Sequence, residues 1–395
     1  MTKKLSKNII GLLALLLLFF AIELLSKYIK KGENEESLIL YLHCIEAVLW
    51  IGFLGFISKK EFIKNITITI CSTLILLLFI DVVFFLIIYF TPSPIHLHDE
   101  GSYFDLTIPD SALGYKPKPS IKTERIFKDH GKTIFDAHFT TDQYSRRTYP
   151  TLNISPDKYA IFFGCSMTFG VTNSDSETIP FYVARKSKEF SCYNYAYPGY
   201  GTQQMLANLQ RPNFRNEIKE GKGIGLYMFI DHHLRRVQGD MLITAHWMGD
   251  MPYYILKNDS AIRNGTFRKD RWFISAIYSV LGKSSFLKFF KIDIPISIKT
   301  KDYELSTAII KESRTLYDKQ FGNDNFYVVM LPGTDTTILK YLDKEKIKYL
   351  NYANLYNPGS IGYSFLPYDP HPTPKANKIL AEKLSQDITG ILSPN

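Results

Sequence analysis

Cysteine is scarce in this chain, with only four among 395 residues. Cys44 and Cys71 lie within long apolar runs, where cysteine usually packs as a small apolar side chain. Cys165 and Cys192 lie further along, and their spacing leaves open both a disulfide and two free thiols. The cysteines therefore give no disulfide framework from which a fold could be inferred.

Nucleic-acid-binding motifs are also absent. The net charge of +9 is modest for this length, and no aromatic stacking platform accompanies the basic residues between positions 263 and 301. Two interpretations of this basic stretch remain open. It is either a solvated face or a surface that meets anionic lipid headgroups or an acidic envelope polymer. We expect no nucleic-acid partner.

A metal-ligand cluster is missing as well. The run from His96 to Glu100 has the composition of a metal site, but no ordered set of partner ligands follows it. We therefore predict a solvent-exposed juxtamembrane loop at this position, and neither a metal nor a cofactor.

Three long apolar segments open the chain, at residues 8–26, 38–57 and 66–90. Each reaches the roughly 20 residues that a helix needs to cross a bilayer. The first segment lacks a small-residue cleavage site and is longer than the apolar core of a signal peptide. We therefore predict that residues 1–92 form an uncleaved membrane anchor of three transmembrane helices, with the lipid bilayer as a partner.

Basic residues flank these segments unevenly. Six lysines lie before the first segment or between the second and third, and three lie between the first and second: Lys3, Lys4, Lys7, Lys59, Lys60 and Lys64 against Lys27, Lys30 and Lys31. Because cytoplasmic loops are enriched in basic residues, this favours an inside amino terminus. Three crossings then place the rest of the chain on the extracytoplasmic side of the cytoplasmic membrane.

Three ionisable residues lie inside the apolar segments. His43 and Glu46 share one helical face, and Asp81 lies deep in the third segment. Such residues are functional candidates in a membrane, as in a proton relay. The alternative, which we favour, is that they pair with each other and hold the helices together.

The remainder of the chain divides into an irregular lead-in region with short strands, residues 93–157, and a domain at residues 158–395. In the domain, apolar β-rich runs alternate with helical patterns. The expected strands are 158–165, 192–197, 225–230, 326–331 and 348–351, and the expected helices are 178–188, 203–217, 302–320 and the carboxyl-terminal segment. This alternation predicts a parallel sheet in a three-layer α/β/α domain. An insertion at 238–300 interrupts it and is expected to form a lid or side wall.

One serine stands at the end of the first expected strand. Gly164 and Gly170 bracket Ser166, so the backbone can turn tightly there. Ligands of open α/β sheets bind at the carboxyl ends of the strands. The segment is not the Gly-x-Ser-x-Gly elbow of α/β-hydrolases, because Thr168 replaces the second glycine. Taken alone, Ser166 is more often a helix cap than a nucleophile.

The far end of the chain supplies an aspartate and a histidine. Asp369 and His371 precede the terminal helical pattern, in which Thr373 is a natural N-cap and Pro374 a natural first residue. Capping and catalysis are compatible at this turn. The chain order of serine, aspartate and histidine, with the last two only two residues apart, differs from the three familiar orders of the catalytic triad.

Together these blocks resemble the SGNH (GDSL-like) hydrolase superfamily, whose first block reads Gly-Asp-Ser and whose last reads Asp-x-x-His or Asp-x-His-Pro. The resemblance implies a flavodoxin-like α/β fold in which Ser166 is the nucleophile, His371 the base and Asp369 its orienting partner. It also implies that the backbone N–H groups of Gly199 and Ser166 form the oxyanion hole. Cys165 stands where the family has aspartate, and we expect strand alternation to point it away from the site.

The third block departs from the family pattern. The family has Gly-x-Asn-Asp there, but the segment 229–236 contains no asparagine. Loss of one oxyanion donor costs about 3 kcal/mol, or roughly 10² in rate. We expect His232 to be an alternative donor, and Arg235 or Arg236 to offset the missing donor or to bind an anionic substrate.

Three functions remain open at this stage. The first is a membrane-anchored serine esterase that removes O-acyl groups from an extracytoplasmic glycan or lipid. The second is an O-acyltransferase that uses the same triad to acylate an envelope polysaccharide together with a partner protein. The third is a scaffold without strong catalysis that binds glycan in an envelope assembly complex.

Overall fold

The computed structural model describes residues 2–28, 33–91, 97–100 and 106–393. The chain forms two compact units, and the second is interrupted by part of the first. We call residues 1–93 and 276–296 the helical unit, and residues 94–275 and 297–395 the sheet unit.

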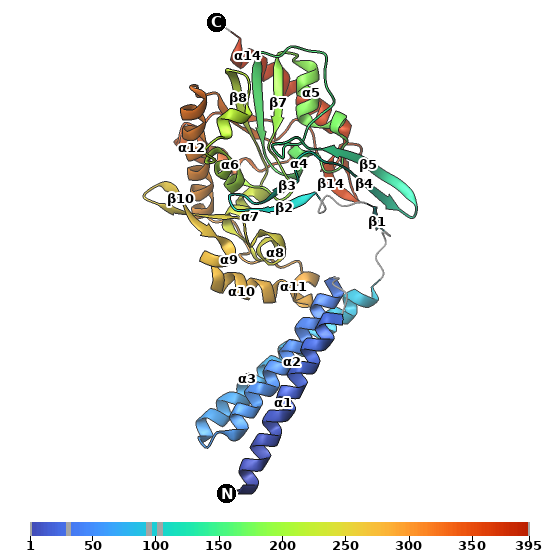
Figure 1. The fold of residues 1–395 in the computed structure, drawn as a ribbon, viewed down its shortest axis with the longest axis vertical. Coiled ribbons are helices and arrows are strands. Elements are labelled where there is room, and N and C mark those ends of the chain that lie inside the picture. The colour runs from blue at the N-terminus through green and yellow to red at the C-terminus, as the bar shows by residue number, and fades with distance from the viewer. Residues whose placement is uncertain (1, 29–32, 92–96, 101–105, 394–395) are drawn as a thin grey trace. The chain divides into compact units, whose positions relative to one another are not determined.

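Three long helices make up most of the helical unit (Figure 1): α1 (Thr2–Tyr28), α2 (Glu33–Ile57) and α3 (Glu61–Phe90). The stretches Asn8–Ser26, Ser37–Ile57 and Glu61–Phe90 are each long and apolar enough to cross a membrane. Their side chains are almost entirely unburied by protein, which is the expected state of helices whose solvent is lipid. The three predicted apolar helices are therefore confirmed, while the membrane in question and the side of the sheet unit stay predictions.

The ionisable residues of these helices have partners, although not all are the expected ones. His43 Nδ1 lies 3.4 Å from Glu46 Oε2 on the same helix. The Asp81 carboxylate instead accepts hydrogen bonds from Tyr41 of α2 and from the segment Ser284–Phe286. Asp81 therefore holds parts of the helical unit together through neutral hydrogen-bond donors.

A five-stranded parallel sheet forms the centre of the sheet unit, in the order β12-β11-β8-β6-β7. Its strands are β6 (Lys158–Phe163), β7 (Phe190–Asn194), β8 (Lys222–Phe229), β11 (Phe326–Met330) and β12 (Tyr349–Asn351). The residues of β6 from Tyr159 to Phe163 are at most 1% exposed, as expected for a strand covered on both faces. The predicted α/β class with a parallel sheet is confirmed.

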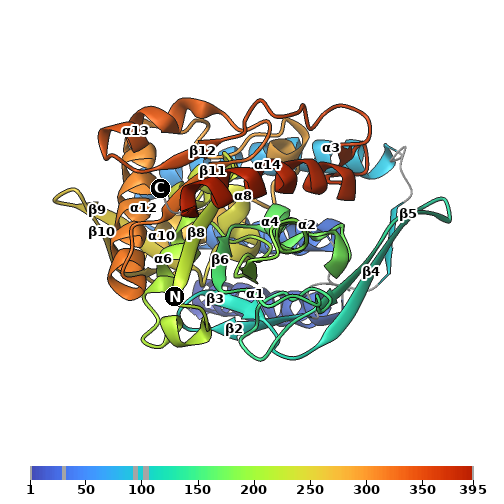
Figure 2. The same cartoon turned by 90° about the horizontal axis from the view of Figure 1, so that it is seen from above.

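Alternate residues of β6 pack into two different cores. Tyr159, Ile161 and Phe163 belong to a cluster with side chains of α6, α12 and α13. Ala160 and Phe162 belong to a cluster with α5 and α14. The sheet therefore lies between two helical layers (Figure 2), formed by α6 (Thr202–Leu209), α12 (Thr300–Phe321) and α13 (Leu339–Lys344) on one face and by α5 (Ile179–Lys186) and α14 (Pro374–Leu392) on the other.

The lead-in region is more regular than the sequence suggested. An antiparallel three-stranded sheet and a short hairpin occupy it: β1 (Leu97–Glu100), β4 (Lys122–Asp129) and β5 (Lys132–Thr140) in the sheet, β2 (Thr107–Asp110) and β3 (Gly114–Pro117) in the hairpin. The prediction of a loop at 96–100 is wrong for 97–100, which pair with β4, while His96 lies outside the described residues. Phe127, Phe135 and Phe139 give the sheet its own buried face, and this alternation was masked by the polar residues between them.

The insertion at 238–300 contains a hairpin and several short helices. After α7 (His232–Gln238) come α8 (Met241–Ile243), a π-helical turn at Thr244–Met248, β9 (Pro252–Lys257), β10 (Ser260–Thr266), α9 (Phe267–Asp270), α10 (Trp272–Leu281) and α11 (Ser285–Phe289). The β9–β10 hairpin packs on α12. Residues 276–296 instead group with the helical unit. A lid or side wall stays a prediction.

A glycine in β8 offers a test of the sheet packing. A Cβ at Gly223 would lie 2.1 Å from the carbonyl oxygen of Tyr159 on the neighbouring strand, whereas a Cβ at Gly221 would meet nothing within 4 Å. We expect Gly223→Ala to lower the free energy of unfolding by about 1–3 kcal/mol through overpacking, and Gly221→Ala to change it by less than about 0.5 kcal/mol. Denaturant unfolding of the full chain in detergent measures both. Equal stability of the two variants would contradict the packing described here.

Candidate active site

The turn after β6 presents Ser166. The strand ends at Phe163, and α4 (Ser166–Phe169) begins three residues later. A Cβ at Gly164 would lie 2.4 Å from Thr168 Oγ1, so only glycine lets α4 fold back this closely. Gly170 ends α4 with φ +84°, a conformation that favours glycine. Ser166 therefore stands at the carboxyl end of a central strand, where the sequence placed it.

The turn before α14 presents Asp369 and His371. Both belong to β14 (Asp369–Pro372), which pairs with the short strand β13 (Ser364–Phe365). Thr373 caps α14 by accepting the N–H of Ala376, and a proline occupies the start of the helix. The capping interpretation of this turn is thus confirmed. The cap fixes the backbone at Thr373, two residues after His371.

The structure brings the three side chains together. His371 Nε2 lies 2.7 Å from Ser166 Oγ, across 205 positions of sequence. His371 Nδ1 lies 2.5 Å from Asp369 Oδ1, which also accepts the backbone N–H of His371 at 2.8 Å. An ionised carboxylate can only accept, so Nδ1 carries the proton and Nε2 is left to accept from the serine hydroxyl. This is the geometry that an activated serine requires.

The aspartate is held in its ionised form. Burial alone would raise the pKa of Asp369, but the hydrogen bonds and charge of His371 outweigh it, with a smaller contribution from Arg125. The pKa of Asp369 therefore lies below its ordinary value. A carboxylate that stays charged fixes the imidazole tautomer and stabilises the imidazolium.

The loops that carry the serine and the histidine are tied to each other. The carbonyl oxygen of Pro372 accepts hydrogen bonds from Asn173 Nδ2 at 2.9 Å and from Thr172 Oγ1 at 3.2 Å. Asn377 Nδ2 of α14 donates to the carbonyl of Glu177 at 3.0 Å. These contacts fix the residue next to His371 against the loop that follows α4.

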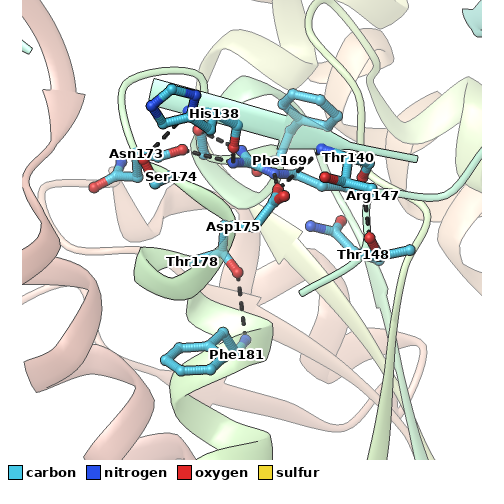
Figure 3. A network of polar contacts seen from close by, with 12 residues as sticks. His138, Thr140, Arg147, Thr148, Phe169, Asn173, Ser174, Asp175, Thr178 and Phe181 are labelled. Carbon is cyan, nitrogen blue, oxygen red and sulfur yellow. Dashed lines mark hydrogen bonds and ion pairs between the residues drawn. The ribbon is translucent and has the colours of Figure 1, made fainter. Parts of the chain in front are cut away.

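A buried arginine from the lead-in region holds that loop in turn (Figure 3). The Arg147 guanidinium donates to the carbonyls of Phe169 at 2.6 Å, Gly170 at 2.5 Å and Asn173 at 2.6 Å, and to Asp175 Oδ1 at 3.0 Å. Its side chain is fully buried. Burial lowers the pKa of Arg147 to about 10, so the group remains charged at neutral pH. Nothing in the sequence around Arg147 indicated this role.

Gly199 lies in a tight turn after β7, the strand adjacent to β6. Its φ is +81°, and a Cβ would lie 2.1 Å from Tyr115 Oη and 2.7 Å from the Trp247 ring. Tyr115 donates to the carbonyl of Pro198 at 2.7 Å, and Arg236 donates to the carbonyl of Tyr200. The backbone at Gly199 is therefore fixed on both sides, and its role in an oxyanion hole stays a prediction.

The three residues expected to offset the missing asparagine, His232, Arg235 and Arg236, lie on α7, and their roles stay predictions. His232 and Arg235 line a cavity of about 290 Å³ whose walls, among the described residues, include neither Ser166 nor His371. Burial, with Arg236 and Arg235 nearby, lowers the pKa of His232. Arg236 is buried, and it lies 5.7 Å above the ring of Trp247. Its observed contacts therefore assign it to supporting the Gly199 turn.

Cys165 and Cys192 are both buried free thiols, so the structure contains no disulfide between them. Among the residues that the structure describes, no three His, Cys, Asp or Glu side chains gather in a way that could hold a metal ion.

No family model and no curated protein matches the chain. Among solved structures, a protein described as a lipolytic protein of the G-D-S-L family from Desulfitobacterium hafniense shares 13% identity, with a TM-score of 0.33, over 58% of this chain and 98% of that one. A lipolytic G-D-S-L protein from Veillonella parvula shares 13%, with a TM-score of 0.30, over 59% and 98%. An acetyl xylan esterase from the rumen bacterium Butyrivibrio proteoclasticus shares 11%, with a TM-score of 0.36, over 75% and 87%. Because these scores are low, we argue the function from the site itself.

We expect Arg147→Ala to destabilise the sheet unit by about 3–5 kcal/mol, because it leaves Asp175 and three carbonyls without their buried donor. Arg185→Ala on the exposed face of α5 is the matched control and should change stability by less than about 0.5 kcal/mol. Denaturant unfolding of the full chain measures both. Similar stability of the two variants would contradict the role given to Arg147.

The lowered pKa of Asp369 predicts an acid dependence of stability. A carboxyl whose pKa is lower in the folded state stabilises the fold above its ordinary value of 3.8, and this contribution is lost as the pH falls through the folded value. We expect the difference in unfolding free energy between wild type and Asp369→Asn to be constant at neutral pH and to shrink below about pH 4. A difference that stays constant at all pH values would contradict the pairing of Asp369 with His371.

Proposed function

We propose that this chain is a membrane-anchored serine esterase that removes O-acyl groups from an extracytoplasmic glycan or lipid. The observation that supports it most is the chain of hydrogen bonds from Ser166 Oγ through the His371 ring to Asp369. Two loops and a buried arginine hold these side chains together. The sequence blocks around them resemble those of the SGNH hydrolases.

The proposed reaction begins with attack of Ser166 Oγ on the acyl carbonyl carbon, while His371 Nε2 accepts the hydroxyl proton. The backbone N–H groups of Gly199 and Ser166 stabilise the oxyanion. His371 then gives its proton to the leaving alcohol, and the acyl group remains on Ser166. Water then attacks the carbonyl carbon of the acyl-enzyme while His371 Nε2 accepts a proton from it. His371 returns this proton to Ser166 Oγ, and the carboxylic acid leaves.

A small apolar cavity, lined among the described residues by chain neighbours of the triad residues and not by Ser166, Asp369 or His371 themselves, is compatible with an acyl substrate. It has a volume of about 60 Å³, and its walls include Met167, Pro370 and Pro372, the chain neighbours of Ser166 and His371. Apolar walls suit the hydrocarbon part of an ester better than a phosphoryl or sulfuryl group, which requires nearby cations.

Acyl transfer to a sugar hydroxyl is the second candidate, because the same acyl-enzyme serves both reactions. The glycan scaffold is less favoured, because a scaffold has no physical need for an aligned Ser166, His371 and Asp369. The extracytoplasmic location rests on the lysine distribution around the apolar helices.

Hydrolysis of p-nitrophenyl acetate by the full chain in detergent tests the proposal. We expect Ser166→Ala and His371→Ala to lower kcat/KM by at least about 10³-fold, and Asp369→Asn by about 10²- to 10⁴-fold. Ser360→Ala, an exposed serine in a surface loop, is the matched control and should retain wild-type activity. Unchanged turnover in Ser166→Ala would refute the mechanism.

A fluorophosphonate probe separates a wrong substrate from a wrong mechanism. If Ser166 is activated, mass spectrometry should find the probe on Ser166 in the wild type and not in His371→Ala. Acylated oligosaccharide formed in preference to free acid would favour the transferase.

A further inference from the structure

The segment 276–296 of the helical unit exposes apolar side chains, although the residues before and after it in the sequence belong to the sheet unit. Ile277 and Val280 of α10 are 40% and 50% exposed, and Phe289 and Phe290 at the end of α11 are 44% and 51% exposed. A helix on an aqueous surface would turn such residues inward and present polar ones. An apolar face of this kind requires a cover.

A carboxylate of α3 fastens this segment to the membrane helices. Asp81 Oδ2 accepts the N–H of Ser285 at 3.1 Å, and Oδ1 accepts the N–H of Phe286 at 3.0 Å and the hydroxyl of Ser284. Tyr41 of α2 donates to Asp81 Oδ2 at 2.8 Å and lies 2.9 Å from the hydroxyl of Ser285. The orphan N–H groups at the start of α11 are thereby satisfied where water is scarce.

Aromatic packing continues this contact. The ring of Phe84 on α3 lies 5.2 Å from that of Phe286, 4.9 Å from that of Phe289 and 5.2 Å from that of Phe290. Ser37 at the start of the second apolar stretch donates to the carbonyl of Lys283 at 3.2 Å. The segment is therefore a packed part of the helical unit.

The segment also lines one side of an apolar cavity of about 420 Å³, which α2 and α3 line as well. Most of its lining is aliphatic, and the carboxylate of Asp81 accepts hydrogen bonds from two other polar lining groups, Tyr41 and Ser284. Apolar cavities do not hold ordered water. Between helices that cross a bilayer, lipid hydrocarbon is the solvent available to fill it.

The length of α3 allows the contact to lie in the outer part of one bilayer leaflet. α3 has 30 residues and is therefore about 45 Å long, which exceeds the roughly 30 Å of a hydrocarbon core. Asp81 lies nine residues before Phe90, about 14 Å from the end of the helix. Lys288 and Lys291 follow in the segment and can extend their ammonium groups to lipid headgroups.

We propose that residues 276–296 are a fourth membrane-embedded element, which lies in the interfacial layer of the bilayer with Ile277, Val280, Phe289 and Phe290 in the lipid acyl chains. The chain then contacts the bilayer twice: first through α1 to α3, and again through residues 276–296, which lie in the sequence between the two parts of the sheet unit. This inference does not depend on the esterase activity.

Site-specific fluorescence tests this location in the full chain reconstituted into phosphatidylcholine vesicles. The environment-sensitive dye NBD is attached at Ile277→Cys in a chain whose four native cysteines are replaced by alanine. Ile361→Cys, which replaces an isoleucine that is fully exposed in the sheet unit, is the matched control. Doxyl-labelled lipid reports contact with acyl chains, and aqueous iodide reports contact with water.

We expect the dye at position 277 to lose most of its fluorescence to doxyl lipid and little to iodide, and the dye at position 361 to show the reverse. Quenching at 277 by iodide to the same extent as at 361 would overturn the proposal. Protection at 277 from both quenchers would also overturn it, because a protein surface would then be the cover.

Asp81→Leu tests the anchor separately. It removes the acceptor for the N–H groups of Ser285 and Phe286, so trypsin should cleave after Lys283 and Lys288 several times faster than in the wild type. Thr73→Leu is the control, because the hydroxyl of Thr73 bonds within α3. Equal cleavage rates in the two variants would exclude Asp81 as the anchor.

Discussion

The buried guanidinium of Arg147 is the interaction on which the candidate site depends most. It lies outside the parallel sheet, yet its donors satisfy the carbonyls of the loop that follows Ser166. That loop in turn supplies Asn173, which holds the residue next to His371. A charged group buried this deeply is costly unless every donor finds an acceptor, so the loop has little freedom to rearrange. The serine and the histidine are thereby placed by a residue that takes no part in their hydrogen bond.

The antiparallel lead-in region thus has a structural reason to be present. A parallel sheet with its helices would place Ser166 at a strand end, but the loop beyond it needs a donor that the sheet does not supply. β5 and the turn after it bring Arg147, and β3 brings Tyr115 to the turn at Gly199. The lead-in therefore supports both loops from which the proposed nucleophile and oxyanion donor come.

Nearly all of the sheet could be predicted from the sequence, because buried parallel strands are continuous apolar runs and each is followed by a helical pattern. Short strands were expected in the lead-in, but their positions and pairing were not, since their buried phenylalanines alternate with charged residues and resemble irregular structure. The predicted helix at 203–217 ends early, at Leu209, and a turn of 3₁₀ helix at 214–217 completes the segment. His232 and Arg235 were assigned to the site from their place after β8; they line a cavity whose walls, among the described residues, include neither Ser166 nor His371, and their role stays a prediction.

The sequence by itself determined the apolar helices, the parallel sheet and the identities of Ser166, Asp369 and His371, because periodicity and turn chemistry are local properties. Only the tertiary structure decided that these three side chains lie within hydrogen-bonding distance, since 205 positions separate Ser166 from His371. It likewise decided that Arg147 faces the loop after Ser166, and that residues 276–296 join the membrane helices through Asp81. These contacts depend on how loops and helices that are distant in sequence pack together. A local sequence pattern carries no information on such packing.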